Sequence, residues 1–489
     1  MASSFPIQKT NGSLSQATAK AWEALLEQHS QALETASSEG TAASQQRHRS
    51  RGQLLARERV NLLLDSDSPF LELCALAGHD LEDSSPCASL VAGIGTVSGG
   101  AWNELTVLKQ NRVTQIATEN DLPMIGLVQS AGVFLPQQFK VFHKGGQIFR
   151  DLATRSAQGK PNCTVVFGSS TAGGAYHPAM SDYTIFVENQ AQVFLGGPPL
   201  VKMATGEIVD AETLGGAKMH GTVTGLADQI ATDEFDAIRK ARDWVKTLKT
   251  PLVKELSSTE SLPPRYSPAE LLSIVDPDIR KALNMREVIL RVVDDSRWLD
   301  FKPSFGQNLI TAWANIYGKF HMKSPMFLHN VTGFMVGQKA EESAIIKHGA
   351  QMVSAVSCST VPHISIIIGA SYGAGNYAMC GRAYQPRFLF SWPSGRCSVM
   401  GPDQLVGVME SIGGGKNGTN GSVGKARKSS EELRQDVLRD GSCYCTSAVL
   451  LDDGVIDPRD TRDVLGVCLD ITACSGSQGA QSHRGLARM

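Results

Sequence analysis

Two glycine-rich segments in this chain have the residue types to bind an anion through backbone N–H groups. The first covers residues 165–176 (VVFGSSTAGGAY), and the second covers residues 366–377 (IIIGASYGAGNY). In each, an apolar stretch typical of a buried β-strand precedes small residues, which leave the first N–H groups of a helix unobstructed. Unsatisfied donors and the helix dipole favour negative charge there. Two donors directed at one oxygen form an oxyanion hole, and each contributes roughly 3–4 kcal/mol to stabilising an enolate.

The two segments are separated by a constant spacing of 201 residues, and the register extends beyond them. Gly132 corresponds to Gly333, since each follows an apolar segment. Gly197-Pro198 has a near-register counterpart in Gly401-Pro402. One such turn more often serves only to pack a helix closely on a sheet, whereas a matched pair favours a binding site. The pattern predicts two copies of one α/β domain.

The composition indicates a large folded protein with ordinary surface charge. The chain has 489 residues, of which 42% are hydrophobic and 19% are charged, which suits two or three domains. Its net charge of −2 gives no electrostatic reason to expect nucleic acid or an anionic membrane as a partner. No apolar run approaches the roughly 20 residues that span a bilayer. The ten cysteines include no Cys-x-x-Cys pair, which predicts a reducing compartment.

No motif supplies a catalytic side chain. The chain has no His-Glu-x-x-His, no Cys and His at metal-ligand spacing and no Gly-x-Ser-x-Gly, so neither a catalytic metal nor a serine nucleophile is expected. His177, beside the first turn, could line a pocket or be solvated. If two backbone oxyanion sites face each other, one can hold a thioester enolate. The other can then hold the ureido oxygen of a second reactant that carries its own base.

Composition along the chain predicts the order of its parts. Proline and serine mark a linker, and a stretch rich in Gly, Asn, Ser and Lys predicts a flexible surface loop. The expected parts are a helical lead-in at 1–49, a first domain at 50–250 with a helix over 233–249, a linker at 251–268, and a second domain at 269–489 with a loop at 413–428.

Several long strings carry a family resemblance. They include 50–59 (SRGQLLARER), 171–182 (TAGGAYHPAMSD), 194–202 (FLGGPPLVK), 332–337 (TGFMVG) and 452–458 (DDGVIDP). Across about residues 20–466 the chain resembles the carboxyltransferase (beta) subunit of biotin-dependent acyl-CoA carboxylases, in particular the 3-methylcrotonyl-CoA and geranyl-CoA branch.

The resemblance implies a fold and an assembly. Each half is expected to be a crotonase-type ββα superhelix, so that the chain is an α/β protein of two tandem domains. The beta subunits would form a hexamer of stacked trimers. A separate alpha subunit would carry biotin, and none would be attached to this chain. The acyl-CoA would lie between the first half of one subunit and the second half of another.

The resemblance also implies roles for the two turns. Backbone N–H groups at Gly173 and Gly174 would hold the thioester oxyanion, and those at Gly373, Ala374 and Gly375 would hold the biotin ureido oxygen. The expected acyl-CoA contacts are Ala172, Ala175, Tyr176, Ser130 and Gly132, and the expected biotin contacts are Thr332, Gly333, Phe334, Tyr372 and Asn376. Carboxybiotin would release CO2, and the freed biotin nitrogen would deprotonate 3-methylcrotonyl-CoA, giving 3-methylglutaconyl-CoA in leucine breakdown. Valine at Gly174 or Gly375 is expected to place its side chain against the ligand.

The chain departs from the family pattern in matching places. Segments are missing after Gly99 and after Lys319, and the family's Asp-Ser-Gly-Gly turn is Gln129-Ser130-Ala131-Gly132. These departures leave three alternatives open: an active carboxyltransferase, whose substrate is 3-methylcrotonyl-CoA, geranyl-CoA or another acyl-CoA, a non-catalytic paralogue with a structural role, or a different crotonase-type activity. The resemblance implies the mitochondrial matrix. The weak presequence keeps the cytoplasm as an alternative.

Overall fold

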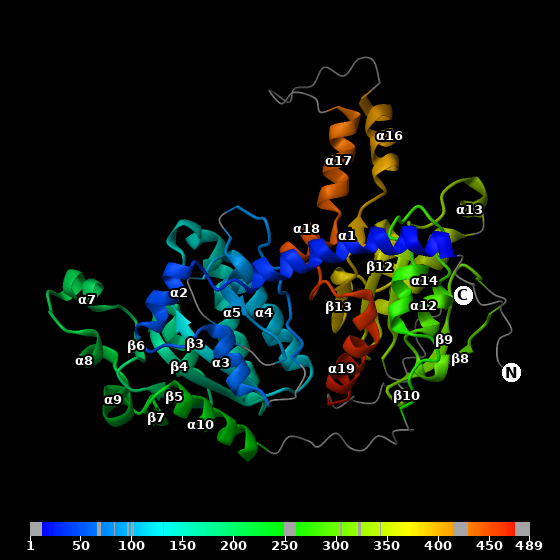
Figure 1. The fold of residues 1–489 in the computed structure, drawn as a ribbon. Helices are drawn as coiled ribbons and strands as arrows, with labels where there is room; N and C mark the ends of the chain where they lie inside the picture. Colours follow the sequence, from blue (N-terminus) through cyan, green and yellow to red (C-terminus); the bar gives the residue numbers. More distant parts are fainter. Residues whose placement is uncertain are drawn as a thin grey trace.

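The structure is a computed structural model that describes residues 12–65, 70–82, 84–94, 97–98, 102–130, 132–248, 261–303, 306–320, 324–342, 344–413 and 429–474. Its two halves lie side by side, each built around a parallel β-sheet (Figure 1). The predicted loop at 413–428 lies outside the described residues apart from Gly413, and so do residues 251–260 of the predicted linker.

The first sheet has the strand order β3-β4-β5-β7, and β6 pairs with the end of β4. All of these pairs are parallel. Central β4 is almost entirely buried because both faces of the sheet are covered. The strands are β3 (Met124–Ser130), β4 (Asn162–Thr171), β5 (Tyr183–Val187), β6 (Gln192–Phe194) and β7 (Gln229–Ala231).

The second sheet repeats this arrangement with the order β11-β12-β13, and β14 pairs with the end of β12. All nine residues of β12 are buried. The strands are β11 (Met326–Val331), β12 (Ile364–Tyr372), β13 (Phe388–Ser391) and β14 (Arg396–Ser398).

The 201-residue repeat of the sequence is a repeat of the structure. In the first sheet the register of β3 on β4 shifts between the pairs Val128–Val166 and Ser130–Ser170. In the second sheet the register of β11 on β12 shifts between the pairs His329–Ile367 and Val331–Ser371. Each of these positions is displaced by the same 201 residues, so even the irregularity beside the glycine-rich turn is duplicated. The predicted fold class is confirmed.

Helices flank both sheets. The N-terminal helix α1 (Gly12–Ser37) packs on the second half. In the first half the helices are α2 (Ala42–Arg49), α3 (Ala56–Leu63), α4 (Glu104–Glu119), α5 (Gln138–Ala157), α6 (Gly173–Ala179), α7 (Pro198–Thr205), α8 (Ala211–Gly215), α9 (Ala217–Met219) and α10 (Glu234–Thr247). In the second half they are α11 (Leu271–Ile274), α12 (Met285–Leu290), α13 (Gln338–Glu342), α14 (Ile345–Ser357), α15 (Gly373–Ala378), α16 (Pro402–Gly413), α17 (Ser430–Asp440), α18 (Cys443–Ala448) and α19 (Thr461–Cys474).

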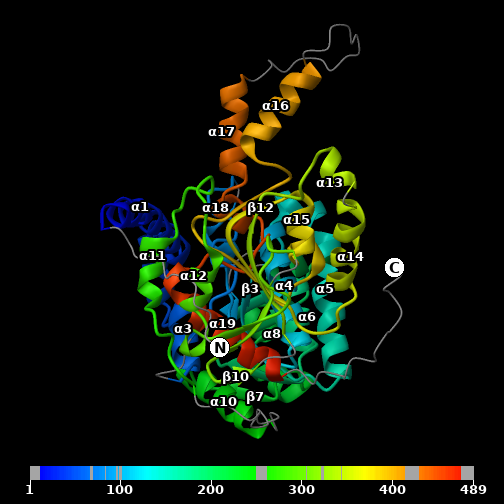
Figure 2. The ribbon, with the colours of Figure 1, turned by 90° about the vertical axis from the view of Figure 1, so that its right-hand side faces the viewer.

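Local signals explain where several helices begin. The helix predicted at 233–249 is confirmed as α10. It begins after Asp233 because the Asp233 side chain accepts a hydrogen bond from the Asp236 N–H and so caps the helix. Pro198 and Pro402 occupy the first positions of α7 and α16, where a missing N–H costs nothing. Helices α16 and α17 form a hairpin that projects from the second half (Figures 1 and 2).

Short antiparallel sheets precede each parallel sheet. One pairs β1 (Leu90–Val91) with β2 (Val97–Ser98), and the other joins β8 (Trp298–Asp300), β9 (Ala312–Ile316) and β10 (Lys319–Phe320). In the first half, α4 follows β2 and leads into β3. In the second half, only five residues separate β10 from β11, which leaves no room for such a helix. Leu328 on β11 is partly exposed, whereas its counterpart Leu127 on β3 is fully buried.

The N-terminal helix is part of the second half's core. Trp22 on α1 is fully buried, and its indole N–H donates to the carbonyl of Val275 at 2.7 Å. Its ring also meets Trp392 edge to face, with the centroids 6.3 Å apart. Figure 1 shows α1 lying across the second half. The predicted lead-in at 1–49 therefore has a structural role that its thin apolar stripe did not reveal.

Helix α4 of the first half binds the second half through buried charge. The Arg112 guanidinium donates to both carboxylate oxygens of Asp453, at 2.8 and 2.9 Å. Arg382 donates to the same carboxylate at 2.8 Å, and the Leu389 N–H donates at 2.9 Å. The two arginines hold the pKa of Asp453 well below its usual range despite complete burial. At the end of α4, Arg387 donates to the carbonyl of Glu119 at 2.6 Å.

Candidate active site

The first glycine-rich turn joins β4 to α6. The Ala172 N–H donates to the carbonyl of Phe194 on β6 at 3.1 Å, and the Ala175 N–H donates to the carbonyl of Ala172 at 3.1 Å. Gly173 and Gly174 lie between them at the first positions of α6, where N–H groups have no partner within the helix. Ala172 is exposed and Gly173 is half-buried, so a ligand can reach this turn.

The second turn joins β12 to α15 in the same way. Gly373, Ala374 and Gly375 occupy the first turn of α15 and have helix-start N–H groups. Ala374 is exposed, and Gly373 is half-buried. A β-carbon at Gly373 would come within 3.0 Å of the Val399 carbonyl oxygen.

The two turns share a backbone feature. Ala172 and Gly373 both have a left-handed backbone, with φ of 54° and 53°. Two residues further on, Gly174 and Gly375 are both buried, whereas the exposed residue is Ala172 in the first turn and Ala374 in the second. An equivalent pair of N–H groups is therefore presented at equivalent places on the two halves. Such a pair can bind an oxyanion without any side-chain catalyst.

The buried glycines face the protein scaffold. A β-carbon at Gly174 would lie 3.1 Å from the Ser170 hydroxyl and 3.4 Å from the Ser130 β-carbon. A β-carbon at Gly375 would lie only 2.7 Å from a methyl group of Val331 and 3.4 Å from the α-carbon of Gly333. The expectation that valine at these positions would point at a ligand is therefore wrong. A larger side chain there would push the helix away from the neighbouring strand.

A hydrogen-bonded chain of side chains lies beneath the second turn. His329 Nδ1 is 2.9 Å from the Ser371 hydroxyl, which accepts a hydrogen bond from Asn376 Nδ2 at 2.8 Å. His329 is fully buried, and burial lowers its pKa to about 4, so its ring is neutral. In the first turn, the Ser170 hydroxyl donates instead to the carbonyl of Gly174 at 2.8 Å. Sequence reasoning missed His329, although a histidine within an apolar strand was a signal.

The predicted acyl-CoA residues lie around the first turn. The Ser130 hydroxyl is buried and accepts a hydrogen bond from the Gly132 N–H at 3.1 Å, so it shapes the end of β3. Ala175 is buried, while Tyr176 is 46% exposed and its ring contacts that of Phe149, with the centroids 5.6 Å apart and the planes tilted by 55°. Tyr176 and Ala172 are thus the side chains of this set that can contact a ligand directly.

The predicted biotin residues divide into exposed and inward-facing side chains. Thr332 is exposed, whereas Phe334 packs over Gly349 of α14. Tyr372 is 5% exposed and precedes α15. The Asn376 amide is turned inward to Ser371. The Thr332 side chain and the Ala374 backbone are accessible for direct contact with a ligand. Tyr372 and Asn376 support the turn.

Two further side chains near the first turn also face inward. His177 is buried, and its Nδ1 lies 3.3 Å from the amide nitrogen of Gln110 on α4. Burial lowers the pKa of His177 to about 4, so it is neither solvated nor a pocket-lining acid. Gln129 accepts a hydrogen bond from Arg59 at 3.2 Å and lies against Gly168.

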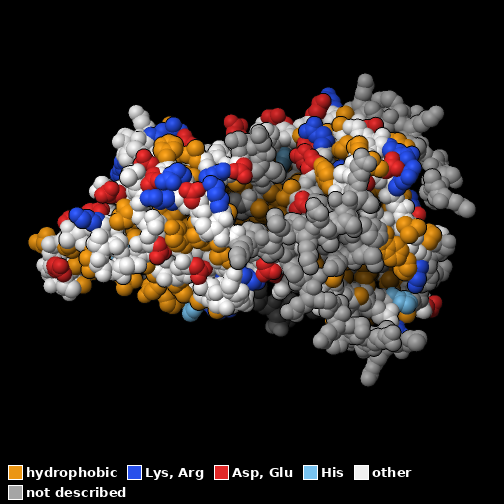
Figure 3. All heavy atoms as spheres, turned by 90° about the horizontal axis from the view of Figure 1, so that it is seen from below, with side chains coloured by type: hydrophobic (Ala, Val, Ile, Leu, Met, Phe, Trp, Pro, Cys, Tyr) orange, Lys and Arg blue, Asp and Glu red, His pale blue; other side chains and the backbone are white. Residues whose placement is uncertain are grey.

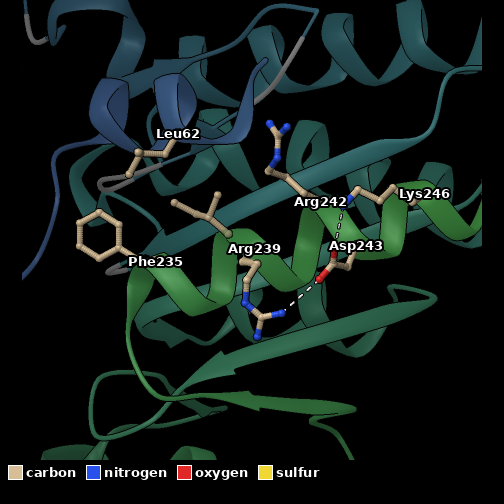
Figure 4. Close-up of a pocket in the computed structure, with 7 residues that line it drawn as sticks. Leu62, Phe235, Arg239, Arg242, Asp243 and Lys246 are labelled. Carbon is tan, nitrogen blue, oxygen red and sulfur yellow. Dashed lines mark hydrogen bonds and ion pairs between the residues drawn. The ribbon is translucent and has the colours of Figure 1, made fainter. Parts of the chain in front are cut away.

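Other features of the described residues do not resemble a catalytic centre. A cavity of about 180 Å³ lies between α3 and α10 (Figure 4), where Asp243 pairs with Arg239 and Lys246. Within the described ranges, no three His, Cys, Asp or Glu side chains gather as metal ligands do. No helix of the described chain is long and apolar enough to cross a bilayer.

Large apolar side chains are exposed near both turns. They include Leu135, Phe139 and Phe142 on and beside α5, Leu200 and Met203 on α7, and Met335, Val336, Ile346 and Val399 in the second half. Figure 3 shows apolar side chains at the end of the molecule formed by α7 and α8. Exposed apolar patches are typical of surfaces that contact a protein, a membrane or a ligand.

Comparison with known proteins gives the family. The carboxyl transferase domain family matches residues 47–320 and 324–484, and the interruption at 321–323 falls where the sequence predicts a missing segment. A probable biotin-dependent acyl-coenzyme A carboxylase beta2 subunit of Mycobacterium tuberculosis is 46% identical, over 91% of this chain and 92% of that one. A probable mitochondrial methylcrotonoyl-CoA carboxylase beta chain of Drosophila melanogaster is 43% identical, over 91% and 88%.

A solved structure agrees. The beta subunit of Pseudomonas aeruginosa geranyl-CoA carboxylase superposes with a TM-score of 0.85 at 36% identity, covering 96% of each chain. The chain belongs to the carboxyl transferase domain family, among the beta subunits of biotin-dependent acyl-CoA carboxylases. The family resemblance predicted from the sequence is confirmed, as is the carboxyltransferase class of activity.

Proposed function

We propose that this chain transfers a carboxyl group to 3-methylcrotonyl-CoA, using the N–H groups of its two glycine-rich turns. The supporting observation is the matched geometry of the turns: each has a left-handed residue at the same position, followed two residues later by a buried glycine at the start of a helix. Methylcrotonoyl-CoA carboxylase beta chains are 40–43% identical to this chain, which favours that substrate.

In the proposal, the first turn binds the acyl-CoA. The N–H groups of Gly173 and Gly174 would hold the thioester oxygen as negative charge develops on it, and Tyr176 with Ala172 would line the approach. Stabilising the enolate acidifies the acyl chain without a protein base, because the amides are already oriented before the reaction.

The second turn fits a biotin carbonyl oxygen. Ala374 and Gly375 would direct N–H groups at that oxygen, with Thr332 beside them. The close approach of Gly375 to Val331 and Gly333 keeps these amides in place. Carboxybiotin, on a separate alpha subunit, supplies the carboxyl group and the base.

The complete site is proposed to need a second copy of the chain and an alpha subunit, with the beta subunits forming a hexamer. The exposed apolar side chains beside both turns support an assembly. A mitochondrial location is proposed from the relative named as mitochondrial in Drosophila melanogaster.

The test is carboxylation by the purified chain together with its biotin-carrying alpha subunit. Bicarbonate- and ATP-dependent carboxylation of 3-methylcrotonyl-CoA is expected, with geranyl-CoA assayed in parallel. The structural neighbour gives specific support to geranyl-CoA as the second candidate. Assembly with no turnover on any acyl-CoA would contradict the proposal and favour the structural paralogue.

A further inference from the structure

A buried cysteine and a buried lysine lie in contact outside the proposed active site. Lys109 on α4 is completely buried, and its Nζ lies 2.8 Å from the Sγ of Cys87 and 3.3 Å from the Cys87 carbonyl oxygen. Cys87 is only 4% exposed. Among the described residues, no carboxylate forms an ion pair with Lys109. The thiol is thus the main polar partner of an amine that has lost its water.

Two further acceptors lie beside the Cys87 thiol, and the nearer one is the Leu90 carbonyl oxygen at 3.2 Å. Glu72 is 3.5 Å from the Cys87 sulfur, but both of its carboxylate oxygens are held by Arg57, at 2.8 and 2.9 Å. Burial raises the pKa of the Cys87 thiol, and Lys109 opposes that rise. The Lys109 nitrogen, 2.8 Å from the sulfur, is placed to accept the thiol proton and afterwards to react with the sulfur.

Cys87 lies in a strained backbone segment beside a cavity. Cys87, Ala88 and Ser89 are three consecutive non-glycine residues with a left-handed backbone, at φ of 54°, 49° and 57°. Such conformations are costly and persist only where the surroundings enforce them. Cys87 also lines a cavity of about 230 Å³ with Thr35, His79 and Ser84. That space is large enough to admit water and hydrogen peroxide.

We propose that Cys87 and Lys109 form a peroxide-driven covalent crosslink, a sulfenamide. The Lys109 amine takes the thiol proton, and the thiolate sulfur attacks hydrogen peroxide. The proton then passes from Lys109 to the departing hydroxide, which gives a sulfenic acid, one water and the free amine again. The Lys109 nitrogen then attacks that sulfur, an N–S bond forms, and a second water leaves. One thiol, one amine and one peroxide thus yield one N–S bond and two waters, and the sulfur is the atom oxidised. Sulfenic acids are known to condense with nitrogen in this way.

The bond would fasten the left-handed turn to α4. Helix α4 carries Gln110, which contacts His177 behind the first glycine-rich turn, and Arg112, which binds the second half. The modification thus acts on the helix that joins both halves, without touching the N–H groups proposed for catalysis.

The full chain, treated with hydrogen peroxide and then digested, tests the proposal by mass spectrometry. A peptide joining Cys87 to Lys109 is expected, lighter than its two parts by about 2 Da and split by dithiothreitol. Exposed Cys358 reports in the same sample that the oxidant was active. In Lys109→Met, the crosslink is expected to vanish and Cys87 to continue to the sulfinic acid.

The wild-type digest alone decides the outcome, even if the variant folds poorly. Cys87 recovered as a free thiol or as its sulfinic acid, with Lys109 unmodified while Cys358 is oxidised, would overturn the proposal. So would a disulfide from Cys87 to another cysteine, or an oxygen-bridged product heavier by about 14 Da.

Discussion

Ala172 and Gly373 hold the same left-handed position in the two turns, but only one of them is a glycine. Alanine is strained there, because its β-carbon crowds the backbone at positive φ. Ala172 and Gly373 therefore contribute differently to the free energy of unfolding, even though they occupy equivalent positions in the two turns.

We expect Ala172→Gly to raise the free energy of unfolding by about 1 kcal/mol, since it relieves that strain. The matched change Gly373→Ala is expected to lower it by at least as much, because the new β-carbon also meets the Val399 carbonyl at 3.0 Å. Urea denaturation measures both variants. A destabilised Ala172→Gly would show that the alanine conformation is not strained.

Two buried histidines predict how stability depends on pH. Burial lowers the pKa of His177 and of His329 to about 4 from 6.5, so the unfolded chain takes up protons first as pH falls. The contribution of each histidine to the free energy of unfolding is complete above about pH 6.5. As the pH falls from there to about 4, each contribution decreases by about 1.4 kcal/mol per pH unit. Burial raises the pKa of Asp452 to about 6 from 3.8. Between these two pH values, Asp452 therefore makes the free energy of unfolding change with pH in the opposite direction.

Below pH 6.5, His329→Gln is expected to reduce the slope of the free energy of unfolding against pH by about 1.4 kcal/mol per pH unit. Urea denaturation of the wild type and the variant between about pH 7 and pH 4.5 gives the difference, in which the Asp452 contribution cancels. Parallel profiles for the two proteins would mean that His329 has the same pKa in the folded and unfolded states, which would contradict the effect of burial.

At the scale of elements, α15 is positioned by contact between Gly375 and β11. Gly375→Ala is expected to destabilise the protein by about 1–3 kcal/mol, because a β-carbon 2.7 Å from Val331 forces α15 outward. Val331→Ala in the same chain is expected to restore most of that loss. Gly407→Ala on α16 is the control: it meets no atom within 4 Å and is expected to be neutral or stabilising. Strictly additive losses in the double variant would contradict this packing.

The sequence predicted the strands, the turns and the helix at α10, because these depend on local patterns of apolar, glycine and capping residues. It could not predict which way a glycine faces. The contacts of Gly174 with Ser170 and of Gly375 with Val331 depend on strand register, which local patterns do not set. Trp22 was underestimated for the same reason, since its partner Trp392 is far away in the chain.

For the whole molecule, the contact between α4 and Asp453 joins the two halves. Asp453→Asn is expected to cost about 3–5 kcal/mol, because it leaves Arg112 and Arg382 without their buried counter-charge. Asp243→Asn, in an exposed ion pair on α10, is expected to cost less than about 1 kcal/mol. Thermal denaturation compares the two variants. Equal small losses would mean that the charge network contributes little.

The central claim is that the first turn binds acyl-CoA and the second binds biotin. The direct measurement is steady-state carboxyl transfer from the carboxylated acyl-CoA to free biotin, with Gly174→Ala and Gly375→Ala compared with the wild type. The account predicts that Gly174→Ala raises KM for the acyl-CoA and leaves KM for biotin unchanged, and that Gly375→Ala does the reverse. Equal changes in both constants, or the opposite assignment, would contradict it.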